Sequence, residues 1–166
     1  MNREYTVEQW LQELSEKFKK INDPFCGIWL IADGIEFLGK CIHSDDFNTN
    51  NHAKSKFKLA IRKIKAFDEY KKIRNMYHKL RCGLTHSMKP EGEIILTKEG
   101  PNDIKPGKAC ISFEQLKKDF EKGVQQLIAG ENGVRTDRLK LKYVVVANQD
   151  GKETTGATPT NQETAN

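Results

Sequence analysis

The stretch Phe25-Cys-Gly-Ile-Trp-Leu-Ile-Ala-Asp-Gly-Ile-Glu-Phe-Leu-Gly-Lys-Cys-Ile-His43 decides the fold, because its apolar residues point in nearly every direction of a helix. A helix that is apolar all round is buried among neighbouring elements. Asp33, Glu36 and Lys40 interrupt the run, which rules out a membrane span of roughly 18 or more apolar residues. Because unpaired charges are costly there, Asp33 and Glu36 either pair with cations of neighbouring helices or face a dimer cleft.

Amphipathic helices are predicted on both sides of this central segment. Upstream, Thr6-Val-Glu-Gln9 forms a capping box that opens a helix, and Asp23-Pro24 ends that helix and begins the central one. Downstream, apolar residues at three- and four-residue steps predict helices over residues 53–67 and about 70–84, with an open boundary near residue 68. A second capping box, Ser112-Phe-Glu-Gln115, opens a helix that reaches about Gly130.

Short strands are predicted on either side of this last long helix. Glu93–Thr97 and Lys108–Ser112, joined by a region rich in Gly, Pro and Asn, predict a β-hairpin at about residues 93–112. Lys140–Ala147 also has strand character. The fold class is therefore mostly α: a bundle of about four to five helices with a small β-hairpin before the last helix. We expect one domain over residues 1–147 and a disordered tail over 148–166, which lacks large apolar residues.

The positive charge is concentrated in the middle of the chain. Residues 54–89 contain twelve Lys or Arg and two acids, a local charge of +10 in a protein whose total is +5. Too few acids are present to form the usual helical ion pairs, so the segment predicts a polyanion partner such as RNA. A solvated helix face is the alternative. The candidate nucleic-acid-binding residues are Lys58, Arg62, Lys65, Arg74 and His78.

The cysteines and the N-terminal residues give an expectation about the compartment. Cys26, Cys41, Cys82 and Cys110 have no short paired spacing, and the first residues lack the apolar core of a signal peptide. We therefore expect a soluble cytoplasmic protein with reduced thiols and no membrane contact.

The segment Tyr77-His-Lys-Leu-Arg-Cys-Gly-Leu-Thr-His86, after two amphipathic helices and before another, resembles the Arg-x4-His motif of the HEPN (higher eukaryotes and prokaryotes nucleotide-binding) superfamily. The resemblance implies a helical bundle that acts as a homodimer and cleaves RNA without a metal or cofactor, as a defence protein or a toxin with a possible cognate antitoxin. It implies that His86 acts as general acid or base and that Arg81 holds the scissile phosphate. Both roles suit the chemistry of these side chains.

The spacing of Arg81 and His86 sets a geometric condition. Five helical steps of about 100° place them roughly 140° apart on a straight helix. They converge only if the helix ends or bends near Gly83, or if two subunits share the site. Two other functions stay open: a non-catalytic module that binds nucleic acid or nucleotide, and a helical interaction protein in which Arg81 and His86 are structural.

Overall fold

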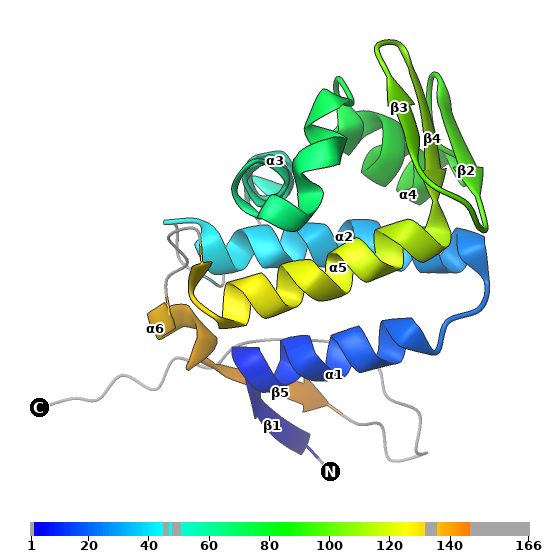
Figure 1. Ribbon diagram of the computed structural model, residues 1–166. Helices are drawn as coiled ribbons and strands as arrows, with labels where there is room; N and C mark the ends of the chain where they lie inside the picture. Colours follow the sequence, from blue (N-terminus) through cyan, green and yellow to red (C-terminus); the bar gives the residue numbers. More distant parts are fainter. Residues whose placement is uncertain (1, 45–46, 48–50, 132–135, 147–166) are drawn as a thin grey trace, which may run out of the picture.

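The computed structural model describes residues 2–44, 47, 51–131 and 136–146. It is mostly helical with two small sheets, which confirms the predicted fold class (Figure 1). The predicted tail over residues 148–166 lies outside the described residues. In chain order the elements are β1 (Asn2–Thr6), α1 (Val7–Lys19), α2 (Pro24–Ile42), α3 (Ala53–Lys63), η1 (Lys65–Lys72), η2 (Tyr77–Cys82), α4 (Gly83–Ser87), β2 (Ile94–Thr97), β3 (Asp103–Lys105), β4 (Lys108–Ser112), α5 (Phe113–Ile128), α6 (Thr136–Leu139) and β5 (Lys142–Val146).

Helix α2 is central, as its all-round apolar sequence predicts. It packs against α1, α3, α5 and η2, and Figure 1 shows α5 running alongside it with α1 beyond α5. Ile28, Ile31, Ile35 and Leu38 of α2 are completely buried. Each such side chain contributes about 1.5–3 kcal/mol relative to an exposed position, so burial of these four residues contributes substantially to the stability of the fold.

Glycines set how closely the neighbours approach α2. The ring of Phe113 occupies the place where Gly27 would carry a Cβ, and a Cβ on Gly34 would lie 2.8 Å from the ring of Phe120. Both phenylalanines belong to α5 and stand seven residues apart, so they repeat every two turns, as the two glycines do. At Gly39 a Cβ would overlap the backbone carbonyl of Lys56 in α3.

The predicted helix starts are confirmed by their caps. The Thr6 hydroxyl accepts a hydrogen bond from the amide of Gln9 at 3.1 Å, and the Gln9 side chain accepts one from the amide of Thr6 at 2.9 Å. Asp23 accepts from the Cys26 amide at 2.6 Å, with Pro24 in the first turn of α2. Ser112 accepts from the Gln115 amide at 3.4 Å at the start of α5. Local side-chain chemistry therefore determines these three boundaries.

The predicted continuous helix over about residues 70–84 is wrong. Residues 65–72 form the 3-10 helix η1, and Asn75 then adopts a left-handed backbone with φ 57°. The next helical segment begins as the π-helical turn η2 and becomes α-helical at Gly83. Asn tolerates the left-handed conformation better than most residues, and here it turns the chain between η1 and η2.

The small sheet before α5 is present, but its pairing differs from the predicted hairpin. β2 pairs with β4 in parallel, and the antiparallel partner of β4 is β3, in the order β2-β4-β3. The chain turns tightly at Pro106-Gly107, where Gly107 has φ 85°. Strand β3 directly precedes this turn, so it is β3 that forms the hairpin with β4. The predicted strand near residue 140 is confirmed as β5, and it pairs antiparallel with β1, which the sequence did not predict.

A buried polar network joins this sheet to η1 and α5. The Tyr70 hydroxyl donates to Asp119 at 2.9 Å and accepts from Asn102 at 2.9 Å. Asn102 also accepts from the amide of Ser112 at 2.9 Å, at the end of β4. Burial and the nearby Asp119 charge raise the pKa of Tyr70 far above its ordinary value, so it stays a neutral donor. This network fixes η1, and with it one wall of the basic surface described below.

Candidate nucleic-acid interface

Three adjoining hollows lie along the basic segment. The α3 hollow, of about 510 Å³, lies between the end of α2 and α3 and is lined by Lys58, Arg62 and Lys63 among others. The central hollow, of about 390 Å³, lies between α3, η1 and the start of η2. The sheet hollow, of about 440 Å³, lies between the η1–η2 segment and the small sheet. Lys or Arg side chains line each of the three hollows.

Neighbouring hollows share lining side chains, so the three hollows lie next to one another in a row, which we call the basic groove. Lys58 and Arg62 line both the α3 hollow and the central hollow. Ile73 and Arg74 line both the central hollow and the sheet hollow. The Lys and Arg residues that line the groove are Lys58, Arg62, Lys63, Lys71, Lys72, Arg74, Lys79, Lys105 and Lys108. The described lining contains one acid, Glu93.

Most of this positive charge is uncompensated. Within the described part of the chain, Lys58, Arg62 and Arg74 form no ion pair, whereas Lys71 pairs with Asp68 and Lys105 with Asp103. Exposed cations without acids produce a positive potential that attracts polyanions and is screened by salt. The groove therefore has the electrostatic properties of a phosphate-binding surface.

The groove contains part of the predicted binding set. Lys58, Arg62 and Arg74 line it together, although they come from α3 and from the segment between η1 and η2. Lys65 and His78 are exposed but line none of the three hollows. Lys105 and Lys108 were missed, because they lie outside the basic segment in the sequence and reach the groove only through the fold of the β3–β4 hairpin.

Arg81 of η2 lines none of the three hollows and lies beside two acidic residues of α2. Its Nε lies 3.2 Å from Oδ1 of Asp33 and 3.2 Å from Oε2 of Glu36. The guanidinium also lies 6.0 Å from the centre of the Tyr77 ring. Of the two roles left open for the carboxylates, pairing with a cation of a neighbouring helix is therefore the one observed. The three atoms are buried without well-aligned hydrogen bonds among the described residues, so attraction between charges dominates the contact.

The environment of Asp33 opposes its charge. Burial raises the pKa of the Asp33 carboxyl above its ordinary value, and the Arg81 charge offsets this only in part. The Asp33 side chain is still 44% exposed, so solvent screens the cluster. With both carboxylates ionised the three groups sum to a charge of −1, which means that Arg81 contributes little net positive field outside the cluster.

The helix that contains Arg81 and His86 is built around a π-helical turn. The amide of Gly83 donates to the carbonyl of His78, five residues earlier. The Thr85 hydroxyl donates to the carbonyl of Arg81 at 2.8 Å and accepts from the Trp29 indole at 3.3 Å, which ties this turn to α2. π-turns of this kind are rare and occur frequently at functional sites.

Gly83 is the point at which the pitch of this helix changes. The helix does not end there: it continues to Ser87, with the exposed His86 in its last turn. A Cβ on Gly83 would lie 2.7 Å from the carbonyl oxygen of Lys89 and 2.9 Å from the amide nitrogen of Glu91. The following loop therefore packs directly on the helix backbone at this residue.

Neither a family model, nor a curated protein, nor a solved structure matches this chain. The HEPN resemblance thus rests on the motif at residues 77–86 and on the order of the helices. Within the part of the chain that the structure describes, none of the helices is both long and apolar enough to cross a bilayer.

Proposed function

We propose that this protein is an HEPN-like RNA-binding module and that RNA lies along the basic groove. The observation that supports this most directly is the row of three neighbouring hollows that share Lys58, Arg62 and Arg74 as lining residues. An extended chain of phosphates matches a path of cations better than a single anion does. Phosphate contacts of this kind supply most of the affinity of non-specific nucleic-acid binding.

Charge-removing substitutions test this proposal. Lys58→Gln and Arg62→Gln should each weaken binding of a labelled single-stranded RNA several-fold at low salt, because each removes a phosphate contact from the middle of the groove. Fluorescence anisotropy measures the effect. Lys118→Gln, an exposed cation of α5 outside the groove, is the matched control and should bind like the unmodified protein. The proposal is contradicted if Lys58→Gln, Arg62→Gln and Lys118→Gln bind RNA with equal affinity, or if the unmodified protein does not bind RNA.

Metal-independent cleavage of RNA is a second candidate function. It is favoured by the placement of Arg81, which two carboxylates orient on a π-helical turn, with His86 exposed at the end of the same helix. In this reading the RNA 2′-hydroxyl attacks the adjacent phosphorus and the 5′-oxygen leaves. His86 transfers a proton to or from these oxygens, while Arg81 donates hydrogen bonds to the phosphate from nitrogens other than the Nε that faces Asp33 and Glu36. A homodimer would place a second pair of these residues next to the first.

The test of cleavage compares the unmodified protein with His86→Ala and Arg81→Lys on labelled RNA in excess chelator. We expect products that end in a 2′,3′-cyclic phosphate, and loss of these products with His86→Ala at unchanged RNA affinity. Arg81→Lys keeps a cation between Asp33 and Glu36, so a loss of cleavage by this variant reports on phosphate recognition rather than on unfolding. If the unmodified protein leaves RNA intact, or His86→Ala cleaves as fast, the catalytic reading is wrong.

A further inference from the structure

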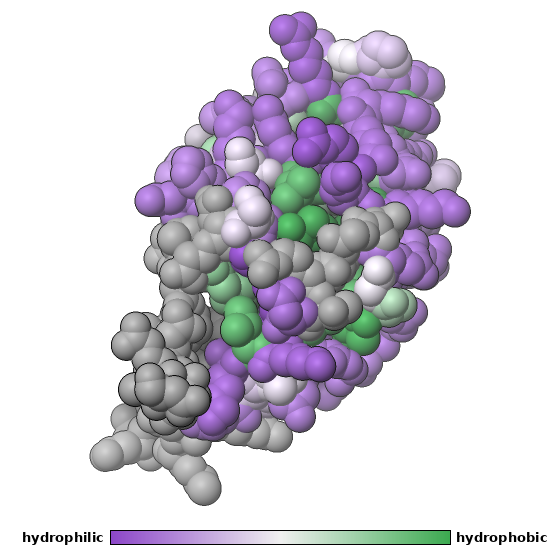
Figure 2. Space-filling model, turned by 90° about the vertical axis from the view of Figure 1, so that its left-hand side faces the viewer, coloured by the Kyte–Doolittle hydropathy of each residue, from purple (hydrophilic) through white to green (hydrophobic). Residues whose placement is uncertain are grey.

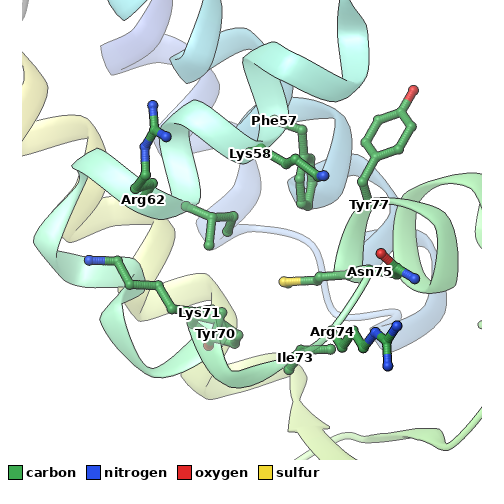
Figure 3. A pocket seen from close by; sticks show the side chains of 11 residues that line it. Phe57, Lys58, Arg62, Tyr70, Lys71, Ile73, Arg74, Asn75 and Tyr77 are labelled. Carbon is green, nitrogen blue, oxygen red and sulfur yellow. The ribbon is translucent and has the colours of Figure 1, made fainter.

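The central hollow differs from an ordinary cluster of surface cations, because its floor is apolar. Phe57, Ile61, Tyr70, Ile73, Met76 and Tyr77 form this floor. Phe57 and Tyr70 are completely buried and lie beneath the surface of this floor, so its accessible surface comes from Ile73 and Tyr77 and from the edges of Ile61 and Met76. Figure 3 shows the four cations of the lining around the opening, with Arg62 and Lys71 on one side and Arg74 on the other. A phosphate on this floor would lose hydration without gaining a partner, so the floor suits an uncharged group.

Tyr77 gives the hollow a fixed aromatic ring. It is partly exposed, and its ring packs edge-on against the buried Phe57 at a centroid distance of 5.5 Å. Figure 3 shows Tyr77 on the same side of the hollow as Asn75 and Arg74. Because the left-handed backbone of Asn75 turns the chain just before η2, Tyr77 lines the same hollow as Lys71 of η1 and Arg74. A partly exposed aromatic ring beside cations is the usual arrangement for stacking a base next to bound phosphates.

We propose that the central hollow binds one unpaired nucleobase of a single-stranded RNA, with the flanking phosphates on Lys58 and Arg62 at one side and on Arg74 at the other. This inference rests on the proposed RNA-binding function and adds the class of RNA. The hollow, at about 390 Å³, falls within the size range of small-molecule sites. A duplex keeps its bases stacked and paired, so it can reach the cations but not the floor.

The decisive comparison holds the phosphates constant and removes the base. The probes are a labelled oligouridylate, the same ribose-phosphate chain made abasic along its length, and an RNA duplex of equal length. We expect the abasic chain to bind about 5- to 150-fold more weakly than the oligouridylate, because loss of one stacked base has an effect of this size. The duplex should also bind more weakly, although it carries more phosphates.

Variants of the hollow locate the effect. Tyr77→Leu keeps an apolar side chain against Phe57 but removes the flat ring, so it should weaken binding of oligouridylate and leave the abasic chain unaffected. Tyr77→Phe keeps the ring and is the matched control. Ile73→Trp fills the hollow from its partly buried edge without removing a core side chain, and it should have the effect of Tyr77→Leu. It keeps the test valid if Tyr77→Leu fails to fold.

The outcomes separate this inference from the proposed function. If all three probes bind with equal affinity, and Ile73→Trp binds like the unmodified protein while Lys58→Gln binds more weakly, RNA binding stands and the base-binding hollow does not. If none of the probes binds at low salt, both the base-binding hollow and the proposed RNA-binding function are wrong.

Discussion

Asp33 shows how the surroundings of a single residue can oppose its favourable ion pair. Its carboxylate lies 3.2 Å from the Nε of Arg81, yet its pKa is raised, because burial disfavours the charged form more than Arg81 favours it. Glu36 supplies a second carboxylate to the same nitrogen at 3.2 Å. Arg81 is therefore already paired without Asp33, and the ionised Asp33 is the least favourable member of the cluster.

This arrangement gives a prediction for pH. Folded Asp33 holds a proton at higher pH than the unfolded chain, whose carboxyl titrates near 3.8. Between pH 3.8 and the raised pKa, the folded state therefore binds more protons than the unfolded state. The contribution of Asp33 to stability falls as pH rises through this range. Because Asn resembles the protonated carboxyl, Asp33→Asn should melt at a higher temperature than the unmodified protein at pH 7, with a difference that shrinks toward pH 4.

Thermal unfolding followed by circular dichroism across this pH range measures the effect. Asp103→Asn, which alters an exposed carboxylate paired with Lys105, is the control and should not show this dependence on pH. A lower melting temperature for Asp33→Asn at every pH would mean that the attraction to Arg81 outweighs burial.

At the level of helices and strands, the sequence predicts what local chemistry determines. Thr6, Asp23 and Ser112 each cap a helix within a few residues, so their hydrogen bonds are encoded locally. The buried face of α5 follows from the spacing of Leu116, Phe120, Val124 and Leu127, all of which lie in the core. The central position of α2 was likewise predictable from its apolar sequence.

Elements that depend on distant partners escaped prediction. β1 exists because Asn2–Thr6 pairs with β5, with Asn2 opposite Val146. Next to the π-helical turn, the loop at Lys89 and Glu91 packs on the helix backbone at Gly83, a contact that the local sequence does not indicate. The sequence placed Lys58, Arg62 and Arg74 in one basic segment, but it could not show that Lys105 and Lys108 would join them.

On the scale of the whole molecule, charge is segregated rather than evenly mixed. Residues 54–89 have a charge of +10, whereas the complete chain has +5, so the rest of the protein is net acidic. Figure 2 shows a face on which hydrophilic residues cover most of the described surface and apolar residues appear in a narrow central strip. The groove places cations from α3, from η1 and η2 and from the small sheet along one path. An RNA strand on it should therefore contact several phosphates at once.

The dependence of RNA affinity on salt counts these contacts. For a single strand, the logarithm of the binding constant falls by ~0.7 per logarithm of salt concentration for each phosphate neutralised. A variant with both Lys58→Gln and Arg62→Gln should therefore have a slope shallower by about 1.4. Tyr77→Leu should lower affinity at every salt concentration and leave the slope unchanged, because stacking releases no counterions. Titrations of labelled oligouridylate at several salt concentrations measure both quantities. A flat salt response of the unmodified protein would show that the groove does not bind the phosphate chain, and a slope altered by Tyr77→Leu would show that the ring acts through the cations.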